Sequence, residues 1–206
     1  MAHSLFVSDL HLCPSRPALA GIFFDFLRGA AMQADALYIL GDLFEYWAGD
    51  DDDTDFNRAV VDALKAYSAG GRALFLLHGN RDFLIGSHFA EATGAVLLDD
   101  PAAVDLYGTP TLLLHGDTLC TDDVKYMAFR AKVRDAAFQR QFLSQSLDAR
   151  KQIIAGLRAE NAGEKQLKSE AIMDVAPATV DATVPSPEAW SAWLSSGDDG
   201  TQESAT

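Results

Sequence analysis

The chain has 206 residues, of which 49% are hydrophobic, and a formal net charge of −14. This length and hydrophobic content predict a folded domain with a core and exclude a chain that is disordered throughout. Two cysteines, Cys13 and Cys120, are too few for a disulfide framework. The N-terminus lacks the pattern of a signal peptide, and the apolar run 18–27 is too short to span a bilayer. We therefore expect a cytoplasmic protein.

Four short apolar runs are each followed at once by Asp, His or Asn. They are residues 5–7, 37–40, 74–77 and 112–114, and they lead into S-D-L-H, G-D, H-G-N-R-D and H-G-D. Helical spacing of apolar residues predicts helices between them, at 18–32 and 56–69. Strands that alternate with helices indicate an α/β domain with a largely parallel sheet. Polar residues directly after such strands meet at one edge of the sheet, so a site is expected there.

Charge divides the chain into three parts. Residues 1–124 carry 6 basic and 19 acidic side chains, residues 125–168 carry 10 and 4, and residues 169–206 carry 7 acidic side chains and no basic one. We predict a core at 1–124, a cap of two or three amphipathic helices inserted at 125–168, and a loosely structured tail at 169–206. The cap is where a phosphate, a nucleotide or an acidic lipid surface would bind. The acidic loop 50–53 is expected to be a solvated turn.

The polar residues after the apolar runs suit a metal site. Asp9 and His11 are two apart in an extended segment, so both can face one side. Asp42 follows a glycine and can bridge two ions, whereas Asn80 offers an amide oxygen and His115 an imidazole nitrogen. Mixed oxygen and nitrogen ligands suit Mn²⁺, Fe or Zn²⁺ better than Ca²⁺. Each residue alone has an ordinary explanation as a helix cap, a turn or a core histidine; together they favour two ions arranged for attack on phosphorus.

The order D-x-H, G-D, G-N-x-D and H-G-D resembles the calcineurin-like metallophosphoesterase superfamily. The longer segments 8–12, 38–45, 78–84 and 115–123, with 171–175, are similar to the bacterial UDP-2,3-diacylglucosamine diphosphatases. The resemblance covers roughly residues 3–180. It implies an α/β fold, the αββα sandwich of that superfamily, with a helical cap insertion.

The resemblance also implies a reaction and its cofactors. Two Mn²⁺ ions would be held, one by Asp9, His11 and Asp42 and the other by Asp42, Asn80 and His115. The expected reaction is hydrolysis of the pyrophosphate bond of UDP-2,3-diacylglucosamine to UMP and 2,3-diacylglucosamine 1-phosphate, in lipid A biosynthesis. The residues implied to contact substrate are Asn80, Arg81, Asp123 and Lys168.

The expected partners follow from the same resemblance. The planar fork of Arg81 matches phosphate oxygens, although a surface arginine beside a loop carboxylate is the simpler alternative. The basic and apolar cap fits a site for acyl chains that rests on an anionic membrane, at the cytoplasmic face of the inner membrane. Its aromatic residues can equally be the inner face of a helical pair. No nucleic acid partner is expected, and no oligomeric state is indicated.

Two departures from the family affect these expectations. The family usually has Ser and Asn where this chain has Asn161 and Lys165, so no substrate role is assigned to either. The family also closes its site with a G-H-T-H motif, whereas residues 116–206 contain no histidine. We therefore expect a truncated or frame-shifted product that lacks the last strands of the sheet. The alternatives are an impaired, non-catalytic remnant and another metallophosphoesterase that acts on nucleotides or phosphoproteins.

Overall fold

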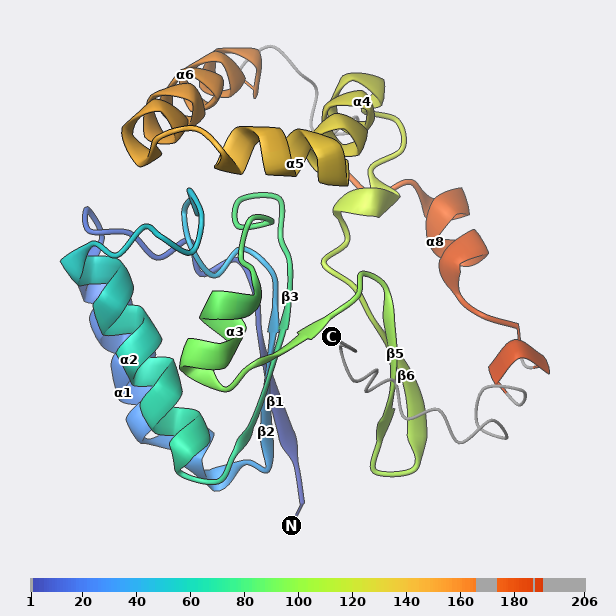
Figure 1. Ribbon diagram of the computed structural model, residues 1–206. Coiled ribbons are helices and arrows are strands. Elements are labelled where there is room, and N and C mark those ends of the chain that lie inside the picture. Colours follow the sequence, from blue (N-terminus) through green and yellow to red (C-terminus); the bar gives the residue numbers. More distant parts are fainter. Residues whose placement is uncertain (1, 166–173, 187, 191–206) are drawn as a thin grey trace.

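The computed structural model describes residues 2–165, 174–186 and 188–190 (Figure 1). Its strands are β1 (Ser4–Val7), β2 (Ala36–Leu40), β3 (Ala73–Leu77), β4 (Val96–Leu98), β5 (Ala102–Leu106) and β6 (Thr109–Leu113). Its α-helices are α1 (Pro17–Arg28), α2 (Asp55–Ala69), α3 (Ser87–Thr93), α4 (Val124–Val133), α5 (Ala136–Leu143), α6 (Leu147–Lys165) and α8 (Pro177–Thr183). Short 3₁₀ helices are η1 (Ala30–Gln33) and η2 (Asp117–Leu119).

The first four strands form a parallel sheet in the order β1-β2-β3-β4. Parallel crossover connections share one hand, so steps in a single direction place the connecting helices on the same face. Figure 1 shows α1, α2 and α3 together on one face of the sheet, and the β5–β6 hairpin on the other. The predicted α/β fold with a parallel sheet is confirmed.

One strand assignment was wrong. The apolar run 112–114 does not contribute a fourth parallel strand, because β6 pairs antiparallel with β5 in a separate two-stranded sheet. The turn between them uses Tyr107 and Gly108, both at positive φ (57° and 85°), which suits a two-residue hairpin. The fourth parallel strand is β4, whose three residues are too few to show a periodic pattern.

The helices begin and end close to the predicted residues. Thr54 caps α2 by accepting a hydrogen bond from the Asn57 N–H at 3.4 Å, and the helix ends before Gly70. Pro17 starts α1, where its missing N–H costs no helical hydrogen bond. The helix predicted to reach residue 32 ends at Arg28, because the chain tightens into η1 after Gly29.

Both faces of the parallel sheet are covered at its central strands β2 and β3, which explains the continuous apolar runs of these strands. Against the helices, Leu37, Ile39 and Leu76 are fully buried with residues of α1 and α2. On the other face, three aromatic rings stack across β1, β2 and β3, with centroids 4.9 and 4.6 Å apart: Phe6, Tyr38 and Phe75. A second core cluster joins Tyr38 to residues of the hairpin.

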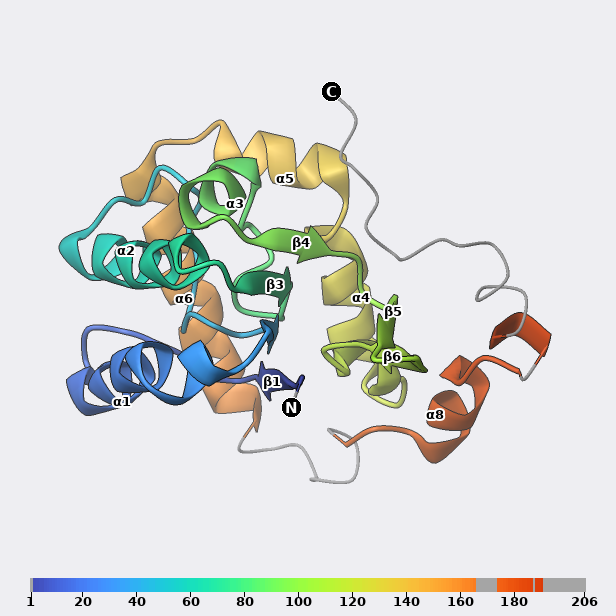
Figure 2. The same ribbon diagram turned by 90° about the horizontal axis from the view of Figure 1, so that it is seen from below.

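Beyond the hairpin lies α8, so helices, sheet, hairpin and helix follow one another (Figures 1 and 2). The Ala176 N–H ties this last segment to the carbonyl oxygen of Leu119 at 2.9 Å. Past residue 165, the described part of the chain contains no strand.

The cap helices α4, α5 and α6 cover the carboxyl ends of β1–β3 (Figures 1 and 2). Asp123 and Asp135 cap α4 and α5 by accepting hydrogen bonds from the N–H groups of Tyr126 and Phe138. Within the described residues, no helix combines the length and apolar content needed to cross a membrane.

The acidic loop 50–53 is only in part the solvated turn that its charge predicted, because Asp51 and Asp53 are exposed and Asp52 is not. Asp52 is only 3% exposed and accepts a hydrogen bond from Lys151 at 2.6 Å. Arg150, 2% exposed, donates to Asp51 and to the carbonyl oxygen of Ala48. The loop therefore holds α6 against the core, a role that no local sequence pattern announces.

Candidate metal centre

The candidate metal centre lies at the carboxyl edge of the sheet, where the structure brings together four of the five predicted ligands, Asp9, His11, Asp42 and His115, with Asn80 in the adjoining loop after β3. Two loops run side by side there. The Asp9 N–H donates to the carbonyl oxygen of Gly41 at 3.1 Å, and the His11 N–H donates to that of Asp42 at 2.9 Å. These backbone bonds align the D-x-H segment with the G-D segment, so side chains from β1 and β2 meet.

Three of these residues adopt a backbone conformation that L-residues rarely take. Asp9, His11 and Asp42 have φ values of 54°, 47° and 54°. Each such residue costs roughly 1–3 kcal/mol, and such residues cluster at functional sites. The described residues include one other non-glycine residue at positive φ, the hairpin residue Tyr107. The concentration of strain at this edge therefore supports a functional role for these side chains.

Asp42 lies between the two imidazole rings. Its Oδ2 is 3.7 Å from His11 Nε2, and its Oδ1 is 3.9 Å from His115 Nε2. Both separations are too long for hydrogen bonds but leave space for an ion with donors about 2.1 Å away. Donor atoms of Asp9, Asp42 and His115 all lie within 4.8 Å of one another. One oxygen of Asp42 thus faces each histidine, which suits a carboxylate shared by two ions.

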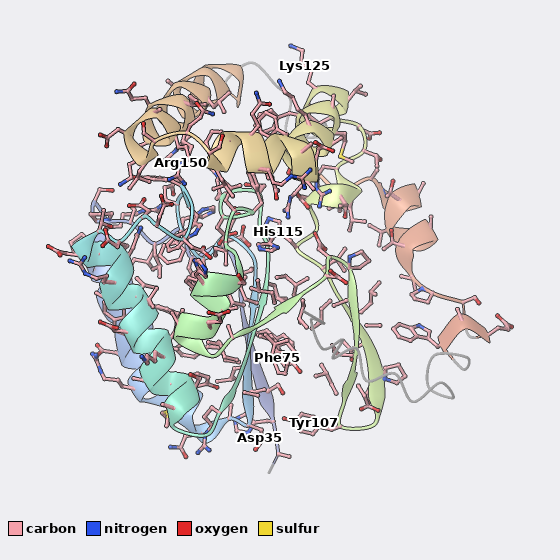
Figure 3. The ribbon with its side chains drawn as sticks, in the orientation of Figure 1. Asp35, Phe75, Tyr107, His115, Lys125 and Arg150 are labelled. Atoms are coloured by element: carbon pink, nitrogen blue, oxygen red, sulfur yellow. The ribbon has the colours of Figure 1, made fainter. Side chains whose placement is uncertain are left out.

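The histidines present the nitrogen that a metal needs. His115 Nδ1 lies 2.9 Å from the carbonyl oxygen of Leu40, which can only accept, so Nδ1 carries the proton and the Nε2 lone pair faces Asp42. Burial lowers the pKa of His11, with Glu45 acting in the opposite direction, and this favours the neutral ring that binds metals. Figure 3 shows His115 between the end of the sheet and the cap helices.

Asp42 is a desolvated carboxylate. It is 2% exposed, and burial, followed by repulsion from Asp82, raises the pKa of Asp42 to about 6. A buried, negatively charged group of this kind needs a cation or a proton. The donor set, its spacing and this unmet charge together fit a divalent metal ion.

Two glycines permit the close packing of the centre. A Cβ added at Gly79 would overlap the carboxylate of Asp42, and one added at Gly41 would lie 2.6 Å from His115 Nδ1. Asp82 fixes the same loops: it is fully buried and accepts hydrogen bonds from the N–H groups of Gly79 and Leu43, at 2.8 and 2.7 Å. The motifs G-D and G-N-x-D are therefore spatial requirements of one assembly.

The predicted substrate residues lie in different surroundings. Asn80 is exposed, beside Gly79. Arg81 donates its backbone N–H to Asp42 Oδ1 at 2.8 Å, and its guanidinium is 3.4 Å from Glu45. Asp123 is buried and caps α4. Lys168 lies outside the described residues, and so do the side chains of Asn161 and Lys165.

Two arginines that the sequence did not single out, Arg130 of α4 and its C-cap residue Arg134, hold the loops of the centre. Arg134 donates to the carbonyl oxygen of Gly79 at 2.9 Å, directly before Asn80. Arg130 donates to Asp117 at 2.8 Å and to Asp100 at 3.3 Å. Burial opposes ionisation of Asp117, but hydrogen bonds from Arg130 and Tyr126 outweigh it and lower the pKa of Asp117. The cap is thus joined to the segments that carry Asn80 and His115.

Carboxylates and imidazoles gathered at the carboxyl edge of a parallel α/β sheet, with an arginine beside them, fit a metal-dependent phosphoesterase. Residues 3–183 match the family model described as calcineurin-like phosphoesterase. The chain belongs to that family.

Curated proteins are similar over most of the chain. The UDP-2,3-diacylglucosamine hydrolase of Xanthomonas campestris pv. campestris strain B100 is 53% identical over 187 residues, which cover 87% of this chain and 76% of that protein. Those of Cellvibrio japonicus and Aromatoleum aromaticum are 51% and 54% identical over 175 and 172 residues, covering 85% and 84% of this chain and 73% and 70% of theirs. These similarities confirm the resemblance drawn from the motifs.

Proposed function

We propose that this chain hydrolyses the diphosphate bond of UDP-2,3-diacylglucosamine and releases UMP and 2,3-diacylglucosamine 1-phosphate. The observation that carries the proposal is the Asp42 carboxylate between His11 and His115, in a chain that is 53% identical over 187 residues to a hydrolase named for this substrate. A nucleotide-directed or phosphoprotein-directed phosphoesterase is the weaker candidate, because the similarity extends through the cap helices.

The proposed ligands follow the geometry of the centre. Asp9, His11 and Asp42 would hold one Mn²⁺, and Asp42, Asn80 and His115 the other. When bound, the pair would neutralise charge on the attacked phosphate and lower the pKa of an attacking water. Mixed oxygen and nitrogen donors support Mn²⁺ over Ca²⁺.

The protein's own groups would position the substrate. The hydrogen bond that the backbone N–H of Arg81 donates to Asp42 keeps this arginine beside the centre. Its guanidinium can there donate two parallel hydrogen bonds to phosphate oxygens. Asn80 is proposed to contact the remainder of the substrate. Asp123 and Lys168, at the two ends of the predicted cap, are proposed to do the same. The cap helices above the centre would shield the reacting phosphate from bulk water.

The cap is also the proposed membrane contact. Val124, Leu143 and Ile153 are exposed on its helices, and Lys125 lies on its outer side (Figure 3). Binding to anionic vesicles should weaken as salt rises, because salt screens the positive charges of the cap. Equal binding to neutral vesicles would contradict an electrostatic contact.

The test of the reaction is Mn²⁺-dependent release of UMP from UDP-2,3-diacylglucosamine. We expect release that Asp42→Ala abolishes. Asp25→Ala is the matched control, since Asp25 is an exposed carboxylate on α1 that pairs with Arg28. Activity that survives Asp42→Ala would contradict the two-metal centre, and turnover of other phosphodiesters alone would contradict the substrate.

A further inference from the structure

Glu45 gathers three arginines from three separate segments beside the metal centre. Its Oε2 pairs with Arg16 of the β1–α1 loop, whereas its Oε1 pairs with Arg158 of α6 and lies 3.4 Å from Arg81. His11 Nδ1 is 3.8 Å from the same Oε2. The carboxylate therefore connects the first loop of the core, the loop after β3 and the cap at one point.

The charges of this cluster do not balance. Three guanidiniums surround one carboxylate, so the four side chains carry an excess of two positive charges. Glu45 is only 16% exposed, whereas Arg16, Arg81 and Arg158 are 45%, 29% and 38% exposed. Like charges held this close repel one another unless an anion joins them. The accessible groups are the cations, and they border the site proposed for a phosphate.

Glu45 is not needed to hold the backbone of these segments. The loop after β3 is fixed by Asp82, by the Arg81 N–H bond to Asp42, and by the Trp47 N–H, which donates to the Arg81 carbonyl oxygen at 3.2 Å. Helix α6 is anchored separately through Arg150 and Lys151. The remaining role for Glu45 is to orient the guanidinium groups with which it pairs.

We propose that Glu45 is a positioning residue for phosphate binding, which holds Arg81 and Arg158 with their free N–H groups toward the diphosphate of the substrate. This inference rests on the proposed function. The guanidinium fork binds phosphate through paired hydrogen bonds, and its advantage over a flexible cation is that its direction is set beforehand. Because the Glu45 carboxylate pairs with both guanidinium groups, it would set the direction of both.

The test compares Glu45→Gln with Asp25→Asn, which removes a carboxylate from an exposed ion pair on α1. Glu45→Gln should raise KM for UDP-2,3-diacylglucosamine roughly tenfold, the factor expected from one charge-assisted hydrogen bond, with a smaller change in kcat. The Mn²⁺ affinity from calorimetry should stay at the value of the Asp25→Asn control, whereas the Tm should fall, because the three guanidiniums lose the carboxylate that joins them. An unchanged KM, or a KM that falls because Glu45 competes with phosphate, would overturn the proposal.

The double variant Glu45→Gln with Arg158→Gln sharpens the test. If Glu45 acts in part through Arg158, the double variant should raise KM by less than the product of the two single effects, whereas effects that multiply fully would refute the proposal. Arg158→Gln alone must also raise KM, which keeps the proposal testable if Glu45→Gln does not fold. Should wild-type protein cleave bis(p-nitrophenyl) phosphate but not UDP-2,3-diacylglucosamine, the proposed substrate fails. The Glu45 effect is then measured on that diester, which also presents a phosphate to Arg81.

Discussion

The metal centre and the cap helices meet at the carboxyl edge of the sheet, but different forces hold them. Backbone groups shape the metal centre: strained φ angles at Asp9, His11 and Asp42, and the Leu40 carbonyl oxygen against His115. The cap is attached by ionised side chains, such as Arg150 with Asp51. Backbone geometry is insensitive to salt, whereas an ion pair whose carboxylate is exposed, such as Asp51 at 62%, is partly screened by it.

The metal centre and the cap therefore differ in how precisely their residues must be positioned. The ligands of a metal must be held within a fraction of an ångström, which packed backbone can provide. Under the proposed function, the cap helices would have to admit the substrate, and attachment through side chains instead of shared backbone would allow this. Changes at the centre should therefore alter metal binding and rate, and changes at the cap should alter stability and substrate affinity.

The largest expected effect concerns the absence of histidine from residues 116–206. Each proposed ion has three protein ligands here, where the family resemblance implies a further histidine for each. A site loosened by ~1 Å can lose ~10²-fold in rate. Placing the family's strand and G-H-T-H motif after Val180 should thus raise Mn²⁺-dependent UMP release by about 10²-fold and tighten Mn²⁺ binding. A 206-residue chain as active as the extended one, or one that binds two ions tightly, would contradict this expectation.

A second prediction compares two glycines. Gly79→Ala forces a methyl group against Asp42, so Mn²⁺ affinity should fall about 10- to 100-fold, as for other changes that disturb ligand orientation. Gly156→Ala on α6 meets nothing within 4 Å, and it should raise stability by roughly 0.5–1 kcal/mol without changing Mn²⁺ affinity. Calorimetric titration and urea unfolding measure the two quantities. Equal Mn²⁺ affinities in both variants would break the comparison.

The sequence predicts the centre better than the cap, for a physical reason. Asp9, Asp42 and His115 directly follow apolar strands or runs, and parallel strands bring their carboxyl ends together. His115 lies in the centre even though β6 is outside the parallel sheet, because its imidazole donates a hydrogen bond to the Leu40 carbonyl oxygen.

The attachments of the cap could not be predicted in this way. Arg150 meets Asp51 across 99 residues, and Arg158 meets Glu45 across 113. Such pairs depend on how helices settle on a finished core, which local periodicity does not encode. The contacts of the acidic loop 50–53 were missed for that reason, because its partners lie on α6, far along the chain.

A third prediction tests the anchor of α6. Arg150→Gln should destabilise the protein by about 1–3 kcal/mol, because the buried Ala48 carbonyl oxygen loses its hydrogen bond. Arg58→Gln is the control: Arg58 is 55% exposed and pairs with Asp55, so its loss should change stability by less than about 0.5 kcal/mol. Urea unfolding of both variants gives the comparison, and Mn²⁺ affinity should be the same in each. Equal destabilisation would show that α6 is held chiefly by its apolar contacts.

The smallest expected effect is the pH dependence of the same anchor. The hydrogen bond from Arg150 lowers the pKa of Asp51, so this pair stabilises the fold above the unfolded value of about 3.9. The contribution is lost as pH falls through the lowered pKa. Because Asp51 is 62% exposed, we expect less than about 1 kcal/mol at neutral pH, and less again in high salt. Urea unfolding of wild type and Asp51→Asn should therefore differ slightly at pH ~7 and converge as the pH falls below the lowered pKa of Asp51. A difference that persists in acid would assign the effect to packing of the loop against α6 instead of charge.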